Sequence, residues 1–276
     1  MNLFHAALLG AVEGLTEFLP ISSTGHLILV AHAIGLTGRV MSDFEIVIQG
    51  GALLAVIWLY RGRIAEALRG MTQSGSRGRR LLLALFVAFL PAAILGLLLH
   101  HKIEEHLFGP LPVAAALLVG GIVMVIVERW RRARGGHPAY EDVDLIPIRV
   151  AFLIGLAQCL SLWPGTSRSM VTILSALLLG CSAVAAAEFS FLLALPTLGA
   201  ATLYDMLKSR HELFGGASVG PAAMIVGIVT AAVVAAIAIR SFIRWLTKHG
   251  LAPFGWYRIA LGLVLLAVLW NHRGTP

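Results

Sequence analysis

Charged residues are scarce in this sequence of 276 residues, of which Asp, Glu, Lys and Arg make up 13%. A soluble domain has about 25%. Hydrophobic residues make up 58% of the chain, and its mean hydropathy is +0.88. Uncharged apolar runs recur, as at 81–99, 113–127 and 222–239, and a membrane-spanning helix needs about 20 such residues. The composition excludes a soluble globular fold and predicts a polytopic membrane protein.

Cysteine is almost absent. Cys159 and Cys181 both lie in apolar sequence, which is typical of buried structural thiols rather than of a disulfide framework. A single disulfide or a metal site stays open as the alternative.

The few charges are unevenly placed. The formal net charge is +7, but the basic residues gather in three connections, whereas the connections at 100–110 and 205–218 hold few. Loops rich in Lys and Arg face the cytoplasm in membrane proteins, so the positive balance indicates topology and predicts no nucleic-acid partner. The three basic groups are Arg61, Arg63, Arg69, Arg77, Arg79 and Arg80; Arg129, Arg131, Arg132 and Arg134; and Arg240, Arg244 and Lys248.

The second half of the chain resembles the first at a shift of 144 residues, the distance from Pro20 to Pro164. The other matched pairs are Ser22 with Thr166, Ser23 with Ser167 and Tyr60 with Tyr204. We therefore expect a single membrane domain over 1–276, with internal repeats at about 1–136 and 148–276.

Each half has the same order of apolar segments: two short ones around a proline break, then three longer ones. The short segments at 3–19 and 24–36 are too polar to span a bilayer separately, and a re-entrant hairpin suits them. Because three spans per half is an odd number, the second half is inverted, and a site is expected where the breaks converge. The expected fold is an all-α integral membrane protein with six transmembrane helices and two re-entrant helical hairpins in two inverted-topology repeats. The long segments are about 44–60, 81–99, 111–129, 187–204, 221–240 and 254–270.

The first break, EGLTEFLPISSTGH, begins with two acids. Glu13 and Glu17 are four residues apart and share one helix face. An ionised carboxylate at bilayer depth costs about 2.5–3.5 kcal/mol, so two neighbouring acids need a cation or a shared proton. The alternative is a helix end at the headgroups, with both acids in water.

The same break ends in Ser22, Ser23, Thr24, Gly25 and His26. Hydroxyls before an apolar helical run are typical of N-caps, but capping needs only one of the three. A helix N-terminus is a ready anion site, glycine allows close approach to the backbone, and a histidine there can titrate near neutral pH. A packing role for the histidine is the alternative.

The second break, PGTSRSMVT, spans 164–172 and places Arg168 among hydroxyls at another helix start. A buried guanidinium needs an anion, and its planar fork suits phosphate oxygens. An ion pair with Glu13 or Glu17 that joins the repeats is the alternative, and it is compatible with a functional role. Two half-helix N-termini and one arginine favour phosphate or diphosphate as the ligand. Gln49, on the first long span, either bonds to the broken backbone around Pro20 or contacts the substrate.

These motifs resemble those of the undecaprenyl-diphosphate phosphatase family, the integral-membrane bacitracin-resistance proteins. The family pairs an E/Q-x-x-x-E helix, a serine-rich turn and a histidine with a P-G-x-S-R-S-x-x-T loop. FEIVIQGGALLAV at 44–56 and FSFLLALPT at 189–197 also resemble family segments, so the resemblance covers nearly the whole chain. Met170 and Gly50 depart from the residues expected there, and neither departure changes a reactive group.

The resemblance implies hydrolysis of the terminal phosphate of a C55 polyprenyl diphosphate, which regenerates the lipid carrier of peptidoglycan synthesis and confers bacitracin resistance. The expected place is the bacterial cytoplasmic membrane, with the site opening to the outer side. A homodimer stays open. The predicted catalytic residues are Glu13, Glu17, Ser23, His26 and Arg168; the predicted substrate-binding residues are Ser22, Thr24, Gly25, Gln49, Gly165, Thr166, Ser167, Ser169 and Thr172.

Within this scheme Ser23 is the favoured nucleophile, with Glu17 or His26 as the base, and activated water is the alternative. Glu13 and Glu17 are the predicted ligands of a divalent cation, Mg²⁺ or Ca²⁺. A different class of function, a polyprenyl-phosphate transporter or flippase, is the competing hypothesis, because inverted repeats with broken helices are typical of carriers. Release of orthophosphate distinguishes the two.

Overall fold

The computed structural model describes residues 1–36, 39–73, 75–107, 109–135, 137–208 and 219–273. Over these residues the secondary structure is helical, with one isolated bridge between Tyr140 and Cys181. The expected all-α class is confirmed. Cys159 and Cys181 are both free thiols, so the disulfide alternative is wrong.

Each predicted transmembrane segment coincides with a long helix in the described chain. Five helices are long and apolar enough to cross a membrane by themselves, and the number reaches six when α3 and the following α4 (Arg61–Arg69), bent by 72°, are taken as one broken span. The chain is therefore a multi-pass membrane protein. The long helices are α3 (Arg39–Leu59), α5 (Arg77–Leu107), α6 (Pro110–Arg134), α9 (Ala183–Lys208), α11 (Pro221–His249) and α12 (Ala252–Arg273).

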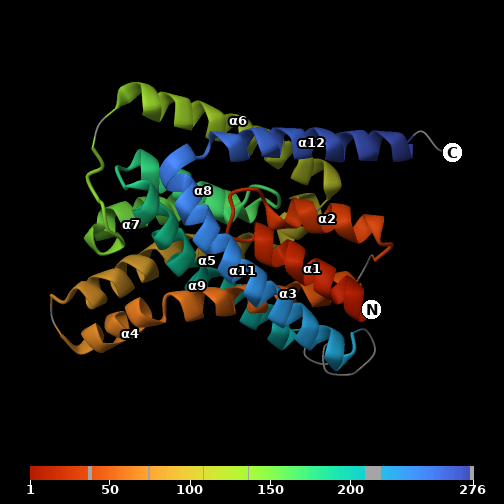
Figure 1. Cartoon of the computed structure of the whole chain (residues 1–276), viewed down its shortest axis with the longest axis horizontal. Helices are drawn as coiled ribbons and strands as arrows, with labels where there is room; N and C mark the ends of the chain where they lie inside the picture. The colour runs from red at the N-terminus through yellow and green to blue at the C-terminus, as the bar shows by residue number, and fades with distance from the viewer. Residues whose placement is uncertain (37–38, 74, 108, 136, 209–218, 274–276) are drawn as a thin grey trace.

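Four short helices form two hairpins. The first hairpin is α1 (Leu3–Thr16) with α2 (Ser23–Ala33), and the second is α7 (Ile148–Gln158) with α8 (Arg168–Leu178). The helices of each hairpin pack against one another. In Figure 1 the first hairpin extends inward from the end of the molecule that carries the N-terminus, and the second extends inward from the opposite end. The proline breaks thus lie at the inner ends of both hairpins.

Helix pairs between the two halves build most of the interior. α1 packs against α11, α7 against α5, α6 against α12, and α3 against α9. Glycines permit the closest of these approaches: a Cβ on Gly10 would lie 2.6 Å from the carbonyl oxygen of Gly227, and one on Gly155 would lie 2.7 Å from the Cα of Ala88. Small residues at helix contacts are the usual means of close packing in a bilayer. This exchange of partners between halves supports the interpretation as two interlocked repeats.

The basic connections lie together at one end of the molecule. Figure 1 shows α4, the C-terminal end of α6 and the turn from α11 to α12 at the left, and both chain termini at the right. A common side for the three arginine-rich connections is the arrangement that the positive-inside rule requires.

Candidate functional site

Each break contains a serine with unusual backbone geometry. Ser22 (φ 71°, ψ 102°) caps α2, and Ser167 (φ 70°, ψ 111°) caps α8; they are the two positive-φ residues other than glycine in the described chain. Each hydroxyl oxygen accepts the N–H three residues on, from Gly25 at 3.4 Å and from Met170 at 3.3 Å. Such strain costs about 1–3 kcal/mol and is concentrated at functional sites. The surrounding structure must hold both turns in place.

The matching caps correct the repeat register at this point. A shift of 144 residues pairs Ser22 with Thr166, but the structure pairs Ser22 with Ser167 as the N-caps of α2 and α8. The register therefore moves by one residue at the breaks, and Ser23 becomes the counterpart of Arg168. The expectation failed because Pro20 and Pro164 align in sequence although the turns that follow them differ by one residue in length.

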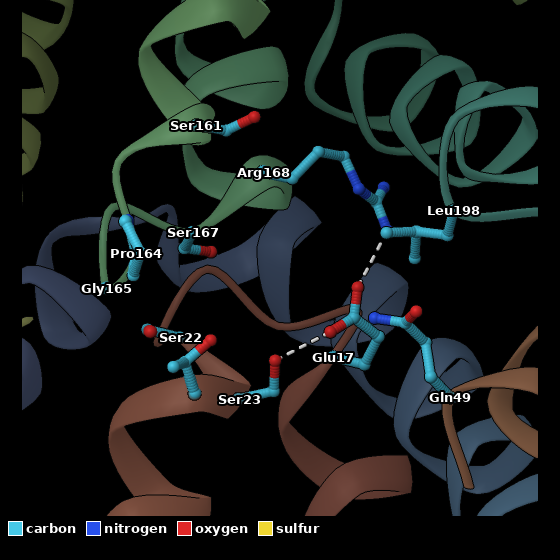
Figure 2. Close-up of a pocket in the computed structure, with 11 residues that line it drawn as sticks. Glu17, Ser22, Ser23, Gln49, Ser161, Pro164, Gly165, Ser167, Arg168 and Leu198 are labelled. Carbon is cyan, nitrogen blue, oxygen red and sulfur yellow. Dashed lines mark hydrogen bonds and ion pairs between the residues drawn. The ribbon is translucent and has the colours of Figure 1, made fainter. Parts of the chain in front are cut away.

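A chain of three side chains joins the two breaks (Figure 2). Nη2 of Arg168 donates to Oε1 of Glu17 at 3.1 Å, and the hydroxyl of Ser23 donates to Oε2 of the same carboxylate at 2.6 Å. The side chains of Arg168 and Glu17 are 8% and 7% exposed. The breaks thus meet as predicted, and the ion pair between the repeats exists. It places the hydroxyl, the acid and the guanidinium in direct contact.

The guanidinium of Arg168 is supported from behind by α9. Nη1 donates to the backbone carbonyl of Ser190 at 2.8 Å, and the ring of Phe18 lies 5.7 Å from Cζ. The hydroxyls of Thr172 and Ser190 lie 2.7 Å apart. Ser190 lies in the segment at 189–197 that resembles the family, but sequence reasoning gave it no role. These contacts aim the Arg168 side chain across the gap toward the first break.

A cavity of about 140 Å³ lies between the breaks. It receives side chains from both halves, and eight of the predicted residues contribute to it (Figure 2). Its lining consists of Glu17, Ser22, Ser23, Thr24, Gln49, Ser161, Pro164, Gly165, Ser167, Arg168 and Leu198. Hydroxyls, an amide, one carboxylate and one guanidinium make this a polar chamber within an apolar protein, which suits a phosphate group better than a hydrocarbon.

Three lining residues refine the expectations. Oε1 of Gln49 accepts a hydrogen bond from Thr202 of α9 at 2.9 Å, so its described partner is α9 and not the backbone around Pro20. Figure 2 shows its amide nitrogen directed toward Glu17. Ser161 and Leu198 were not foreseen, because neither belongs to a motif.

Two predicted substrate ligands make their hydrogen bonds within the protein. Ser169 is fully buried, and its hydroxyl donates to the carbonyl of Leu19 across the repeat boundary at 2.8 Å. Thr172 is also fully buried, and its hydroxyl donates to the carbonyl of Arg168 at 2.8 Å. Neither lines the cavity, so direct contact with a substrate stays a prediction for both.

The remaining small residues serve close packing. Gly165 has φ +90°, and a Cβ there would lie 2.8 Å from the carbonyl oxygen of Val113. A Cβ on Gly25 would lie 3.0 Å from Cδ1 of Leu117. The absence of a side chain at Gly25 therefore allows Leu117 of α6 to pack closely against α2. The backbone N–H of Thr166 donates to the carbonyl of Trp163 at 3.1 Å, which closes the second turn.

His26 faces α12 rather than the cavity lining. Its Nδ1 lies 2.7 Å from the carbonyl oxygen of Ser22 and must donate there, because a carbonyl only accepts. In the neutral ring Nε2 then accepts from the hydroxyl of Tyr257, 2.7 Å away, and the two rings stack with their planes 10° apart. The role of His26 as a base stays a prediction.

Glu13 is buried, 2% exposed, in α1. It lies within electrostatic reach of Glu17, Glu45 and Arg168, but it does not line the cavity. Among the described residues no group of three or more His, Cys, Asp and Glu side chains is arranged to hold a metal ion, and both Glu17 oxygens already have partners. The protein alone therefore provides no complete cation cage.

Arg258 of α12 is the principal residue that sequence reasoning missed. It is fully buried and donates to the carbonyls of Pro20, Ala116 and Gly165. The available signal was its position: it is the one charged residue within the apolar segment at 254–270, and an ionisable residue inside a membrane span indicates a functional site.

The chain matches known proteins over almost its whole length. The family model of the bacitracin resistance protein BacA matches residues 6–264. A protein of Sorangium cellulosum (strain So ce56) named undecaprenyl-diphosphatase is 53% identical over 265 residues, covering 95% of this chain and 85% of that protein. Undecaprenyl-diphosphatase 1 of Chromobacterium violaceum is 46% identical over 270 residues, with 98% and 97% covered. Undecaprenyl-diphosphatase of Thermoanaerobacter sp. (strain X514) is 45% identical over 267 residues, with 97% of each covered.

Proposed function

The chain belongs to the bacitracin resistance protein family, and from this premise we propose that it hydrolyses undecaprenyl diphosphate to undecaprenyl phosphate and inorganic phosphate. Curated relatives that are 45–53% identical carry the name of this activity. The product is the lipid carrier of peptidoglycan synthesis. Its continued supply would underlie bacitracin resistance.

The contact of Ser23, Glu17 and Arg168 across the two breaks carries this proposal. A hydroxyl 2.6 Å from a carboxylate oxygen is within the range in which a base accepts a proton from a nucleophile. The ion pair with Arg168 holds the carboxylate of Glu17 in place beside the Ser23 hydroxyl. The hydroxyl-lined cavity provides the donors that a phosphate needs.

We propose that the reaction takes two steps, phosphoryl transfer to Ser23 and hydrolysis of the phosphoserine. The oxygen of Ser23 attacks the terminal phosphorus while its proton passes to Glu17, and the bond to the bridging oxygen breaks, releasing undecaprenyl phosphate. Water then attacks the phosphoserine and gives a proton to the phosphate, while Glu17 returns its proton to the departing Ser23 oxygen. Direct attack by water activated at Glu17 is the alternative route.

Arg168 has a separate electrostatic role in this scheme. Once Glu17 accepts the proton it becomes neutral, and its attraction for the guanidinium weakens. The positive charge of Arg168 is then available to the phosphoryl group at the stage when that group is being transferred. Such stabilisation and positioning supply most of the catalysis of phosphoryl transfer.

A divalent cation fits this site only together with the substrate. Mg²⁺ commonly uses one or two carboxylates and completes its shell with phosphate oxygens and water, and Glu17 with its buried neighbour Glu13 could supply those carboxylates. Its contribution would be to offset the charge of the diphosphate. Ca²⁺, which takes six to eight oxygen ligands, suits this donor set less well.

We further propose that the protein resides in the bacterial cytoplasmic membrane and that its cavity opens to the outer side. The first hairpin extends inward from the end that carries both termini, opposite the basic connections, and that end is the outer one by the positive-inside rule. The apolar tail would lie between helices in the outer leaflet. A homodimer stays a prediction.

The test is orthophosphate release from undecaprenyl diphosphate by the purified protein in detergent, with and without a chelator. Wild type should release orthophosphate, and Arg168→Gln should lose most of this activity. Arg134→Gln, at an exposed arginine of the basic end, is the charge-matched control and should retain it. Absence of release by well-folded wild-type protein, at any divalent cation concentration, would contradict the proposal and leave lipid transport as the competing function.

A further inference from the structure

Arg258 lies between the two breaks, and no acidic side chain among the residues that the structure describes forms an ion pair with it. The side chain is fully buried, and its hydrogen bonds within the described chain go to backbone carbonyls alone. Its Nε has no partner there. A guanidinium does not lose its proton in proteins, and a buried charge is costly unless its surroundings compensate for it. A residue with this cost needs a reason to be at this position.

Two of the three carbonyls that Arg258 binds occupy equivalent places in the two breaks. Nη1 donates to Pro20 at 3.4 Å and Nη2 donates to Gly165 at 3.0 Å, and each of these residues stands two positions before a positive-φ serine. Helix breaks free backbone carbonyls that must be satisfied inside a membrane protein. One side chain of α12 therefore binds the corresponding carbonyl of both breaks.

The third bond anchors this clamp to the scaffold. Nη2 also donates to the carbonyl of Ala116 in α6 at 3.0 Å. Gly120 of α6 makes the room for it, because a Cβ there would overlap Nη2 and lie 3.0 Å from Cζ. Because α6 and α12 pack together, Arg258 attaches both breaks to the same pair of helices.

We propose that Arg258 is a positioning residue, which fixes the separation of the two breaks and thereby aligns Ser23 and Glu17 with Arg168. This inference rests on the proposed phosphatase activity. A lysine keeps the charge but lacks the planar fork that serves several carbonyls at once. A displacement of about 1 Å between reacting groups can cost about 100-fold in rate.

The kinetic experiment uses Arg258→Lys and Gly120→Ala, with Leu265→Ala as the matched control. Leu265 is buried in α12, about two helical turns from Arg258, and packs in the cluster that joins α12 to α6. We expect both test variants to lose about 10- to 100-fold in kcat, with KM within about threefold of wild type. The control should lose thermal stability and keep its kcat.

A second measurement does not depend on catalysis. Spin labels can be attached at Ala33→Cys and Leu178→Cys, at the ends of α2 and α8 that lie farthest from the breaks. Once Cys159 and Cys181 have been replaced, the distance between the labels reports the separation of the two hairpins. Arg258→Lys should broaden or shift that distance, and the control should not.

The two measurements separate the possible failures. Wild type that releases no phosphate contradicts the proposed function, and the label distance still tests the positioning. Unchanged kcat in folded Gly120→Ala and Arg258→Lys, an unchanged label distance, or an equal kcat loss in Leu265→Ala would each overturn the inference. If Arg258→Lys fails to fold, the kcat of Gly120→Ala, which retains the charge of Arg258, tests the inference instead.

Discussion

Glu17→Gln tests the central contact, because glutamine keeps the shape of the side chain and removes its charge and its basicity. The amide oxygen can still accept the hydrogen bond that Arg168 now gives to Oε1 at 3.1 Å. The glutamine side chain cannot take up the proton of the Ser23 hydroxyl, which lies 2.6 Å from Oε2 of Glu17 in the wild-type protein. Loss of a general base reduces rates by about 10²–10⁴-fold, which corresponds to about 3–5 kcal/mol in the barrier. Orthophosphate release should fall by that factor.

The same substitution removes the carboxylate that is paired with the guanidinium of Arg168, at a site where that side chain is 8% exposed. Removing one member of a buried ion pair costs about 3–5 kcal/mol, whereas removing both often costs less. Glu17→Gln should therefore lower the thermal midpoint in detergent, and the double variant Glu17→Gln with Arg168→Gln should recover part of that loss.

Two results would refute this reasoning. One is activity of Glu17→Gln within about threefold of wild type in a folded sample. The other is a double-mutant cycle in which the stability losses simply add, since residues in contact should show a coupling of about 0.5–3 kcal/mol.

Two further predictions concern the first break, and a third concerns an ion pair outside the candidate site. Ser23→Ala should abolish the trapped phosphoserine and lower phosphate release by at least about 100-fold; full activity would instead leave water as the nucleophile. Ser22→Gly should be more stable than Ser22→Ala, by thermal midpoint, because glycine tolerates φ 71° and both lose the same cap; the reverse order would contradict the strain. The hydrogen bond from Arg63 lowers the pKa of Asp142 below its ordinary 3.8, so its stabilisation is present above about pH 4 and is lost as the pH falls through the lowered pKa. Asp142→Asn should therefore reduce stability at pH 7, by less than about 1 kcal/mol because the side chain is half exposed, and this reduction should shrink as the pH falls through the lowered pKa; a reduction that stays the same as the pH falls would argue against the ion pair.

The sequence was sufficient to predict the kind of fold and the two breaks that meet at the candidate site. A helix through lipid has to satisfy its own backbone and carry apolar side chains, so the long spans are visible as composition. The polarity around Pro20 and Pro164 is costly in a bilayer unless protein surrounds it, and this cost indicated the breaks before any contact was known. Glu17, Ser23 and Arg168 could be selected for the same local reason.

The partners of these residues were decided by the tertiary structure. Arg168 and Glu17 are 151 residues apart in the chain, and Arg258 and Pro20 are 238 apart, so no local pattern specifies either contact. The orientation of His26 toward Tyr257 and the support of Arg168 by Ser190 also depend on how α12 and α9 pack. Hydrophobicity determines where a helix lies with respect to the bilayer, but shape complementarity between helices determines which of its polar side chains meet.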